Sequence, residues 1–401
     1  MKIMEKKNNE LSDKRRLEVQ NEGKNRIMNS GFNGIALVAP RVGKTKMMLD
    51  SLEGSSAEIF VSSPYDVIRK NWLAEHAKWG STSAIKSICH SSLKKIPEGL
   101  PLLIVDEIHT LSPAQIRTIQ QKKPQRIMGL TGFMSQYTQK GLRWNLGLNP
   151  IFEYGIEQAI TDGIISSFDV TVLKCPMNDT NRYVEVFDFS SSRKYWLTER
   201  NAYEYYTEIF EANRSKLLTD PTDADAAKWK EIYARKRQHL IYKSPYKLRF
   251  ANSITDEALK EQRVITFAGN IEISGKLNDH YAYHSKNKKE ENLKKFIAGE
   301  IDKCAVINMA NMGITIPNLK IAIIQQAQST AETSVQRILR VCNLEDMKKA
   351  HIFILAFSNT VEEGWVNDSL EGISPHRVET YDFADYDSCN RKVKEILGRE
   401  S

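Results

Sequence analysis

The segment from Leu37 to Asp50, LVAPRVGKTKMMLD, has the residue types of a phosphate-binding loop. A short apolar run precedes it and a stretch with helical periodicity follows, so Gly43, Lys44 and Thr45 fall where a strand ends and a helix begins. There, backbone N–H groups face bound phosphates, a lysine contacts the β- and γ-phosphates, and a threonine hydroxyl ligates Mg²⁺. The loop usually has glycine at the position of Val38 and a small residue at that of Arg41. The two departures raise the question of whether the site works.

The segment PLLIVDEIHTL supplies the acidic groups that such a site needs. Its apolar run ends in Asp106 and Glu107, and the carboxyl end of a strand is where a second metal contact and a water-activating base belong. We expect Asp106 to hold Mg²⁺ through its water shell and Glu107 to orient and deprotonate the attacking water. A solvated acidic loop is the alternative. The GKT motif upstream favours the catalytic interpretation, and with it a bound ATP.

Strands and helices alternate around these motifs. The runs GIALVAP, EIFVSSP, PLLIVDE and RIMGLTG each have the continuous apolar character of a buried parallel strand, and GKTKMMLDSLE and YDVIRKNWLAEHAKW have helical spacing. This alternation predicts a doubly wound α/β domain over residues 31–168, after a helical lead-in over residues 1–30.

The pattern changes beyond this domain. Residues 169–243 are predicted to be a linker and a helical hairpin, which is charged, aromatic, spans roughly residues 190–243 and is interrupted by TDPTD. The strand-helix rhythm then resumes with RVITFAGN, CAVINMAN, KIAIIQQA and HIFILAF, which predicts a second α/β domain over residues 244–367. Residues 368–401 are predicted to be a polar, peripheral tail.

Composition restricts the class of protein. Of the 401 residues, 41% are hydrophobic and 27% charged, which is typical of a globular chain with more than one domain. The net charge of +7 mildly favours a polyanionic partner. The five cysteines form no CxxC pair, the N-terminus has no apolar signal region, and no apolar run reaches the length of a membrane span. We therefore expect a cytoplasmic protein without structural zinc, disulfides or a membrane partner.

In this order, the motifs resemble the first motor domain of a superfamily-two helicase or translocase. The resemblance rests on GKT, on Asp106-Glu107 with His109, on GLTG, and on Pro64 with Trp72. The segment YGIEQAITDGIISSF is similar to the one that closes this domain in restriction-enzyme motors and phage branch-migration helicases. The loop also varies in chromatin-remodelling motors, so we interpret the site as real, with Arg41 pointing outward or reaching a phosphate.

The resemblance extends to the second half, through about Leu355. SVQRILR is similar to the motif that carries the arginine finger, with Arg340 as the finger, Arg337 in support and Gln336 matching. Leu339 and Asn343 depart from that motif. NMANMGITIPNLKIAII resembles the preceding motif, with Gly313 in place and Thr315 where an aspartate is usual. The resemblance also gives His109 a coupling role and Gln20 a role in reading the adenine edge, although an exposed glutamine on a basic helix is equally compatible.

The resemblance thus implies two RecA-like doubly wound parallel-sheet domains with a helical hairpin between them, and ATP and Mg²⁺ in the cleft. Nucleic acid would cross both domains on the opposite edge. The expected contacts are Pro64, Ser91, Ser92, Thr131, Gly269, Asn270 and Asn308.

The favoured function is an ATP-dependent DNA helicase or translocase acting on branched or forked DNA in replication, recombination or repair. An RNA helicase is the enzymatic alternative, and a nucleic-acid-binding clamp with weakened hydrolysis is the alternative from another class. We also expect the helical hairpin to contact DNA through cations and aromatics, with a hairpin that packs its own aromatics as the alternative. The cations are Lys228, Lys230, Arg235, Lys236 and Arg237, and the aromatics are Tyr195, Trp196, Tyr205, Tyr206 and Trp229.

Overall fold

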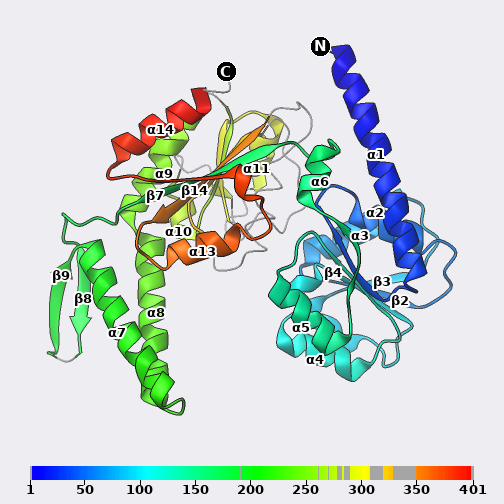
Figure 1. Cartoon of the computed structure of the whole chain (residues 1–401), viewed down its shortest axis with the longest axis horizontal. Coiled ribbons are helices and arrows are strands. Elements are labelled where there is room, and N and C mark those ends of the chain that lie inside the picture. Colours follow the sequence, from blue (N-terminus) through cyan, green and yellow to red (C-terminus); the bar gives the residue numbers. More distant parts are fainter. Residues whose placement is uncertain are drawn as a thin grey trace.

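The structure is a computed structural model that describes residues 2–189, 191–260, 262–269, 271–277, 282–283, 290–307, 319–327 and 349–398. Two α/β domains lie side by side, and a helical hairpin extends from the second one (Figure 1). In the described part of the chain, no helix is both long and apolar enough to cross a membrane.

The first domain is built on a six-stranded sheet in the order β3-β2-β4-β5-β1-β6, with every neighbouring pair parallel. The central strands are buried at every position, which explains their unbroken apolar sequences. The four predicted strands of this domain are confirmed. The strands are β1 (Gly34–Val38), β2 (Ile59–Ser63), β3 (Ile85–Cys89), β4 (Leu102–Asp106), β5 (Ile127–Thr131) and β6 (Pro150–Tyr154).

Helices cover both faces of this sheet, with α1, α2 and α3 on one side and α4 and α5 on the other (Figure 1). Local signals set their ends: α4 begins with Ser112 and Gln115 in a capping box and with Pro113 at its first turn. The helices are α1 (Lys2–Asn29), α2 (Lys44–Ser51), α3 (Asp66–Lys78), α4 (Pro113–Lys122), α5 (Gln136–Leu146) and α6 (Ile156–Thr161), with short turns η1 (His90–Lys95) and η2 (Ile108–Thr110).

The second domain is built on a parallel sheet whose described strands have the order β11-β12-β10-β13-β14-β7-β15. The four predicted strands of this half are confirmed as β10, β12, β13 and β14. The strands are β7 (Phe168–Cys175), β10 (Val264–Phe267), β11 (Ala282–Tyr283), β12 (Lys303–Val306), β13 (Ile321–Ile324), β14 (Ala350–Phe357) and β15 (Val378–Asp382). The helices are α9 (Pro245–Ala258), α10 (Ile271–Ser274), α11 (Glu290–Ala298), α13 (Glu362–Ser369) and α14 (Tyr386–Gly398), with a short turn η6 (Pro375–Arg377).

Two segments differ from their predicted place. Strand β7, expected in the linker, pairs with β14 along its whole length, and β15, expected in the tail, pairs with β7. Helix α14 is not peripheral either, because Cys389, Val393 and Ile396 pack into the core. The tail has a polar sequence because β15 has no fully buried residue and α14 buries only one face.

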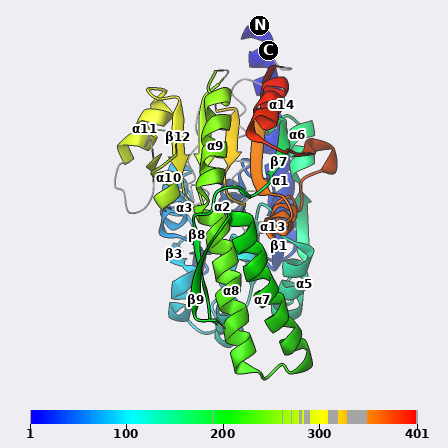
Figure 2. The ribbon, with the colours of Figure 1, turned by 90° about the vertical axis from the view of Figure 1, so that its left-hand side faces the viewer.

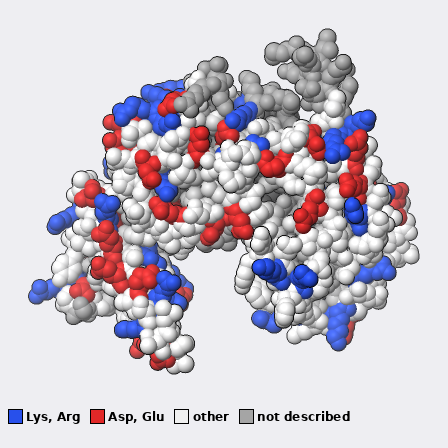
Figure 3. Space-filling model, in the orientation of Figure 1, with Lys and Arg blue, Asp and Glu red and all other residues white. Residues whose placement is uncertain are grey.

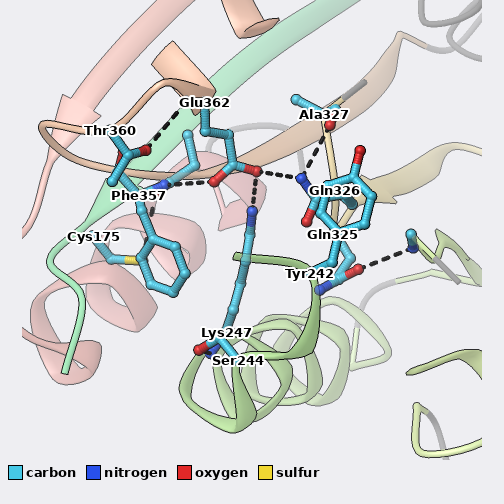
Figure 4. Close-up of polar contacts among 12 residues, drawn as sticks. Cys175, Tyr242, Ser244, Lys247, Gln325, Gln326, Ala327, Phe357, Thr360 and Glu362 are labelled. Carbon is cyan, nitrogen blue, oxygen red and sulfur yellow. Dashed lines mark hydrogen bonds and ion pairs between the residues drawn. The ribbon is translucent and has the colours of Figure 1, made fainter. Parts of the chain in front are cut away.

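A buried ion pair connects the elements of the second domain (Figure 4). The Glu362 carboxylate accepts hydrogen bonds from Lys247 Nζ, from Gln326 Nε2 at 2.9 Å and from the backbone N–H of Phe357 at 3.0 Å. Lys247 and Glu362 are both inaccessible to solvent. The network joins the start of α9 to the carboxyl ends of β13 and β14 and to α13, so it orders the carboxyl edge of the second sheet.

The hairpin consists of α7 (Glu199–Thr219) and α8 (Ala224–Lys243), with the predicted break between them. Thr198 and Asp223 cap the two helices. Tyr195 and Trp196 are not in a helix as expected. They belong to β9 (Arg193–Leu197), which pairs antiparallel with β8 (Val184–Asp188) beside α7. In a five-residue strand with a neighbour close in sequence, strand pairing prevails over the helical spacing of the aromatics.

Candidate nucleotide site

The phosphate-loop segment follows β1 and opens α2, as predicted. Gly43 has φ = 103°, and a Cβ there would lie 2.4 Å from Gln20 Nε2, so only glycine fits. The Gln20 amide donates a 2.7 Å hydrogen bond to the Val42 carbonyl and is buried. Gln20 on α1 therefore fixes the shape of the loop.

The two unusual residues of the loop have different explanations. Val38 is the last residue of β1 and is completely buried, so an apolar side chain suits it. Arg41 has φ = 69°, the left-handed region that glycine adopts most easily. The backbone here has the conformation expected of a small residue, although the residue is arginine.

Lys44 and Glu107 join the phosphate loop to the acidic motif. Lys44 Nζ lies 3.0 Å from Glu107 Oε1, and both side chains are largely shielded from solvent. Glu107 has φ = 49°, an uncommon conformation for a non-glycine residue. The turn after β4 therefore directs the glutamate at the lysine of the loop.

Asp106 is held by two donors of its own. Its Oδ2 accepts from Trp72 Nε1 at 2.7 Å, and its Oδ1 accepts from the Glu107 backbone N–H at 3.0 Å. Burial, and then the charge of Glu107, raise the pKa of Asp106 to about 6, against the lowering effects of Lys44 and of the two hydrogen bonds. Trp72 thus orients the carboxylate of Asp106, the expected metal ligand. In the sequence, Trp72 stands out only as part of a motif.

The residues present fit Mg²⁺. Mg²⁺ is usually bound through one or two protein oxygens together with substrate phosphates and water, and Asp106 with Thr45 offers that set. No group of three acidic, histidine or cysteine side chains suited to a metal occurs among the described residues.

His109 connects this site to the loop after β5. Its Nδ1 lies 2.7 Å from Thr131 Oγ1 and 3.5 Å from Glu107 Oε2. Thr131 Oγ1 in turn donates to the Phe133 carbonyl at 2.7 Å, so it accepts from the Nδ1–H of His109. Burial lowers the pKa of His109, which favours the neutral ring. The sequence predicts that Thr131 contacts nucleic acid. Its side chain is fully buried, so this prediction is wrong.

The loop after β5 reaches the second domain. Gly372, which follows α13, has φ = 87°, and a Cβ on it would lie 2.1 Å from the Phe133 ring. Only glycine allows this approach. A continuous set of contacts therefore runs from Glu107 through His109, Thr131 and Phe133 to the second domain.

The segment that closes the first domain has a structural explanation. Tyr154 donates a 2.7 Å hydrogen bond to Asp162, which also accepts from Arg15 on α1 at 3.0 Å. Next to it, Arg377 of the second domain binds both carboxylate oxygens of Glu157, at 2.7 and 2.9 Å. The tyrosine and aspartate of YGIEQAITDG thus hold this segment to α1, and its Glu157 makes the contact with the second domain.

A cavity of about 530 Å³ adjoins the phosphate loop. Besides the loop residues and Gln20, it is bordered by one face of α3 and by Trp79. Trp79 is 44% exposed, donates a 2.6 Å hydrogen bond to Glu75 and lies under Lys46 Nζ at 4.9 Å from its ring centre. Trp79 matches no motif position, so sequence analysis does not single it out. The cavity is lined by Gln20, Arg41, Gly43, Lys44, Thr45, Lys46, Asn71, Ala74, Glu75 and Trp79.

The expected nucleic-acid contacts are only partly described. Pro64 and Ser91 follow β2 and β3, where Ser91 is exposed and Pro64 and Ser92 are half-buried. Gly269 follows β10, and its N–H donates to Gln325 Oε1 at 3.2 Å. The remaining predicted residues of the second half lie outside the described residues. They are Asn270, Asn308, Gly313, Thr315, Gln336, Arg337 and Arg340.

Comparisons with known proteins agree with this architecture. Residues 247–345 match the model of the helicase conserved C-terminal domain. The structure of S. cerevisiae Dbp5 bound to RNA and ADP BeF3 is similar with a TM-score of 0.57 at 11% identity, over 94% of this chain and 93% of that chain. The ATP-dependent Type ISP restriction-modification enzyme LlaBIII bound to DNA is similar with a TM-score of 0.56 at 12% identity, over 95% of this chain but 32% of that chain. A comparison with curated proteins finds no match.

Proposed function

We propose that this chain, which has two RecA-like domains, is an ATP-dependent DNA helicase or translocase of the superfamily-two type. In the proposed role it acts on branched or forked DNA in replication, recombination or repair.

The observation that carries the proposal is the contact between Lys44 and Glu107, directly beside Asp106. A lysine at a helix start binds phosphate, and a glutamate at the end of another parallel strand of the same sheet binds and deprotonates water. When ATP enters, its phosphates replace Glu107 as the partner of Lys44. Glu107 is then released to act on the water, so nucleotide binding itself prepares the base.

Asp106 and Thr45 would hold Mg²⁺, which when bound withdraws charge from the phosphate oxygens. Trp72 keeps the Asp106 carboxylate in one orientation while this happens. Arg340 is the proposed finger from the second domain, supported by Arg337 and Gln336, because a planar guanidinium suits the charge on the transferring phosphate.

The contacts through His109, Thr131 and Phe133 give the proposed motor a route between hydrolysis and domain movement. Loss of the γ-phosphate changes the position of Glu107, and the neutral ring of His109 passes that change to the loop that touches Gly372. Cleft closure and reopening would then shift the grip on the nucleic acid. Pro64, Ser91, Ser92 and Gly269, with Asn270 and Asn308, are the proposed contacts.

An RNA helicase is the second candidate, because a structure with this fold, Dbp5, is bound to RNA. A clamp with weakened hydrolysis is the third, because Arg41 occupies a position of the loop that favours glycine. ATPase turnover separates the three when it is measured in parallel without nucleic acid and with single-stranded DNA, forked DNA and RNA. Forked DNA should stimulate turnover most, and the Lys44→Ala variant should lose the stimulated rate. Stimulation by RNA alone would select the RNA helicase, and nucleic-acid binding without turnover would select the clamp.

A further inference from the structure

A groove of about 600 Å³ runs between the hairpin and the edge of the second sheet. One wall is the C-terminal half of α8, and the other consists of α10 and the end of β12. Figure 2 shows α10 beside the upper end of α8. The groove is lined by Arg235, Gln238, His239, Tyr242, Lys243, Glu272 and Ile307.

The α8 wall presents a row of basic side chains. Arg235, His239 and Lys243 recur every fourth residue, so they share one face of the helix and follow each other at about 6 Å along its axis. All three are exposed. Two charged side chains with a histidine between them, spread along an open groove, suit a polyanionic strand rather than a compact ligand.

Two other cations of this helix, Lys236 and Arg237, are used inside the hairpin. Lys236 Nζ lies within 5.5 Å of the ring centres of Phe189, Tyr206 and Tyr233, and the Arg237 guanidinium lies 3.8 Å from the ring centre of Phe210. Arg237 is also buried. These residues and their aromatic neighbours form the packed seam of the hairpin, which corrects the expectation that Lys236 and Arg237 face DNA. Figure 3 accordingly shows acidic and basic side chains interleaved on the hairpin face it displays.

The groove begins where the sheet is expected to hold nucleic acid. Glu272 lies two residues after Asn270, and Ile307 directly precedes Asn308. The carboxyl ends of β10 and β12, which lead into these positions, are neighbours in the sheet. A strand that crosses the carboxyl edge of the second sheet is therefore led into the groove along α8.

Two acidic residues lie next to the basic row and leave it accessible to phosphate. Glu231 pairs with Arg235, and Glu272 lies 3.6 Å from Lys243. All four side chains are more than half exposed, and exposed pairs of this kind contribute little to stability. Phosphate can thus replace either carboxylate at small cost. Tyr242 and Ile307 add an apolar surface for sugars and bases.

We infer that this groove binds a single strand of nucleic acid, as a continuation of the track across the second domain onto the hairpin. The inference rests on the proposed function and adds to it a second binding element, which the hairpin contributes through Arg235, His239 and Lys243.

The test compares two double variants by their affinity for a fluorescent single-stranded DNA at several salt concentrations. Arg235→Gln with Lys243→Gln removes two groove cations, whereas Arg214→Gln with Lys216→Gln removes two exposed cations from α7, outside the groove. Each lost phosphate contact lowers the slope of log affinity against log salt by about 0.7 for a single strand. The groove variant should therefore bind more weakly and flatten the slope by about 1.4, and the α7 variant should match wild type.

Further measurements distinguish a failure of the groove inference from a failure of the proposed function. Basal ATPase activity and the melting temperature should be unchanged in both variants, because these side chains are exposed and far from the phosphate loop in the first domain. Each single groove variant should flatten the slope by about half as much. Wild-type affinity and slope in the groove variant, or an equal loss in the α7 variant, would overturn the inference. If wild type itself binds no nucleic acid, the proposed function fails instead.

Discussion

Replacing Arg41 by glycine tests how the unusual phosphate loop combines shape and charge. Arg41 has a left-handed backbone, which costs a non-glycine residue about 1–2 kcal/mol, whereas glycine loses about 0.5–1 kcal/mol through the extra freedom of the unfolded chain. Arg41→Gly should therefore leave the free energy of unfolding unchanged or raise it by roughly 1 kcal/mol. Arg41→Ala keeps the strain, so it should be less stable than the glycine variant by about 1 kcal/mol.

Arg41→Gly and Arg41→Ala should both have a higher KM for ATP than wild type. Arg41 borders the nucleotide cavity together with Lys44 and Thr45, and we expect its guanidinium to contact a phosphate. A hydrogen bond to a charged group contributes about 1.5–3 kcal/mol, which corresponds to a rise in the KM for ATP of roughly 10- to 150-fold. Arg41→Lys, which keeps the charge, should show a smaller rise.

The assays are steady-state ATPase kinetics and thermal melting of the three variants and wild type. An unchanged KM in Arg41→Gly would refute the phosphate contact. Equal melting temperatures for the glycine and alanine variants would refute the strained backbone. The two results are independent, so each part of the reasoning can fail alone.

Three further predictions concern the rest of the molecule. Glu107→Gln should bind ATP but lose hydrolysis by a factor of 100 or more, of the order that general base catalysis contributes, and wild-type turnover would exclude Glu107 as the base. Trp79→Ala should raise the KM for ATP several-fold while leaving inhibition by inorganic tripolyphosphate unchanged, because Trp79 contributes an aromatic ring and no charged group to the cavity. An equal change for both ligands would assign it a purely structural role. Lys247→Met should destabilise the second domain by about 3–5 kcal/mol, because it leaves Glu362 buried without its cation, and adding Glu362→Gln should restore part of that loss in a melting experiment. A double variant no more stable than the single one would contradict this account of the pair.

The motifs and the central strands of both sheets could be predicted, because strands that are buried on both faces have continuous apolar sequences. The phosphate loop and the acidic pair follow such strands directly, so their meeting at one sheet edge followed from the fold class. This meeting of the two motifs brings Lys44 into contact with Glu107.

The features that could not be predicted depend on contacts between distant parts of the chain. Strand β7 has polar residues at Asp169 and Thr171, and its partner β14 lies far along the sequence, so nothing local marks it as an interior strand of the second sheet. The pairing of Gln20 with the loop backbone and the position of Trp79 beside the cavity likewise arise only when α1 and α3 pack against α2.

The orientation of the hairpin cations was also hidden in the sequence. Arg235, Lys236 and Arg237 are adjacent, but a helix turns successive residues by about 100°. One of them therefore faces the groove while its neighbours face aromatic rings. A run of basic residues alone could not separate these roles.

The most direct test of the central claim is ATP turnover by the purified chain in the presence and absence of nucleic acid, with Lys44→Ala measured beside it. We expect forked or single-stranded DNA to raise the rate of wild type strongly, and Lys44→Ala to show no turnover under any condition, because the phosphates lose their cationic ligand. Equal turnover in Lys44→Ala, or a wild-type rate that no DNA or RNA changes, would contradict the assignment of this chain as a nucleic-acid-dependent ATPase.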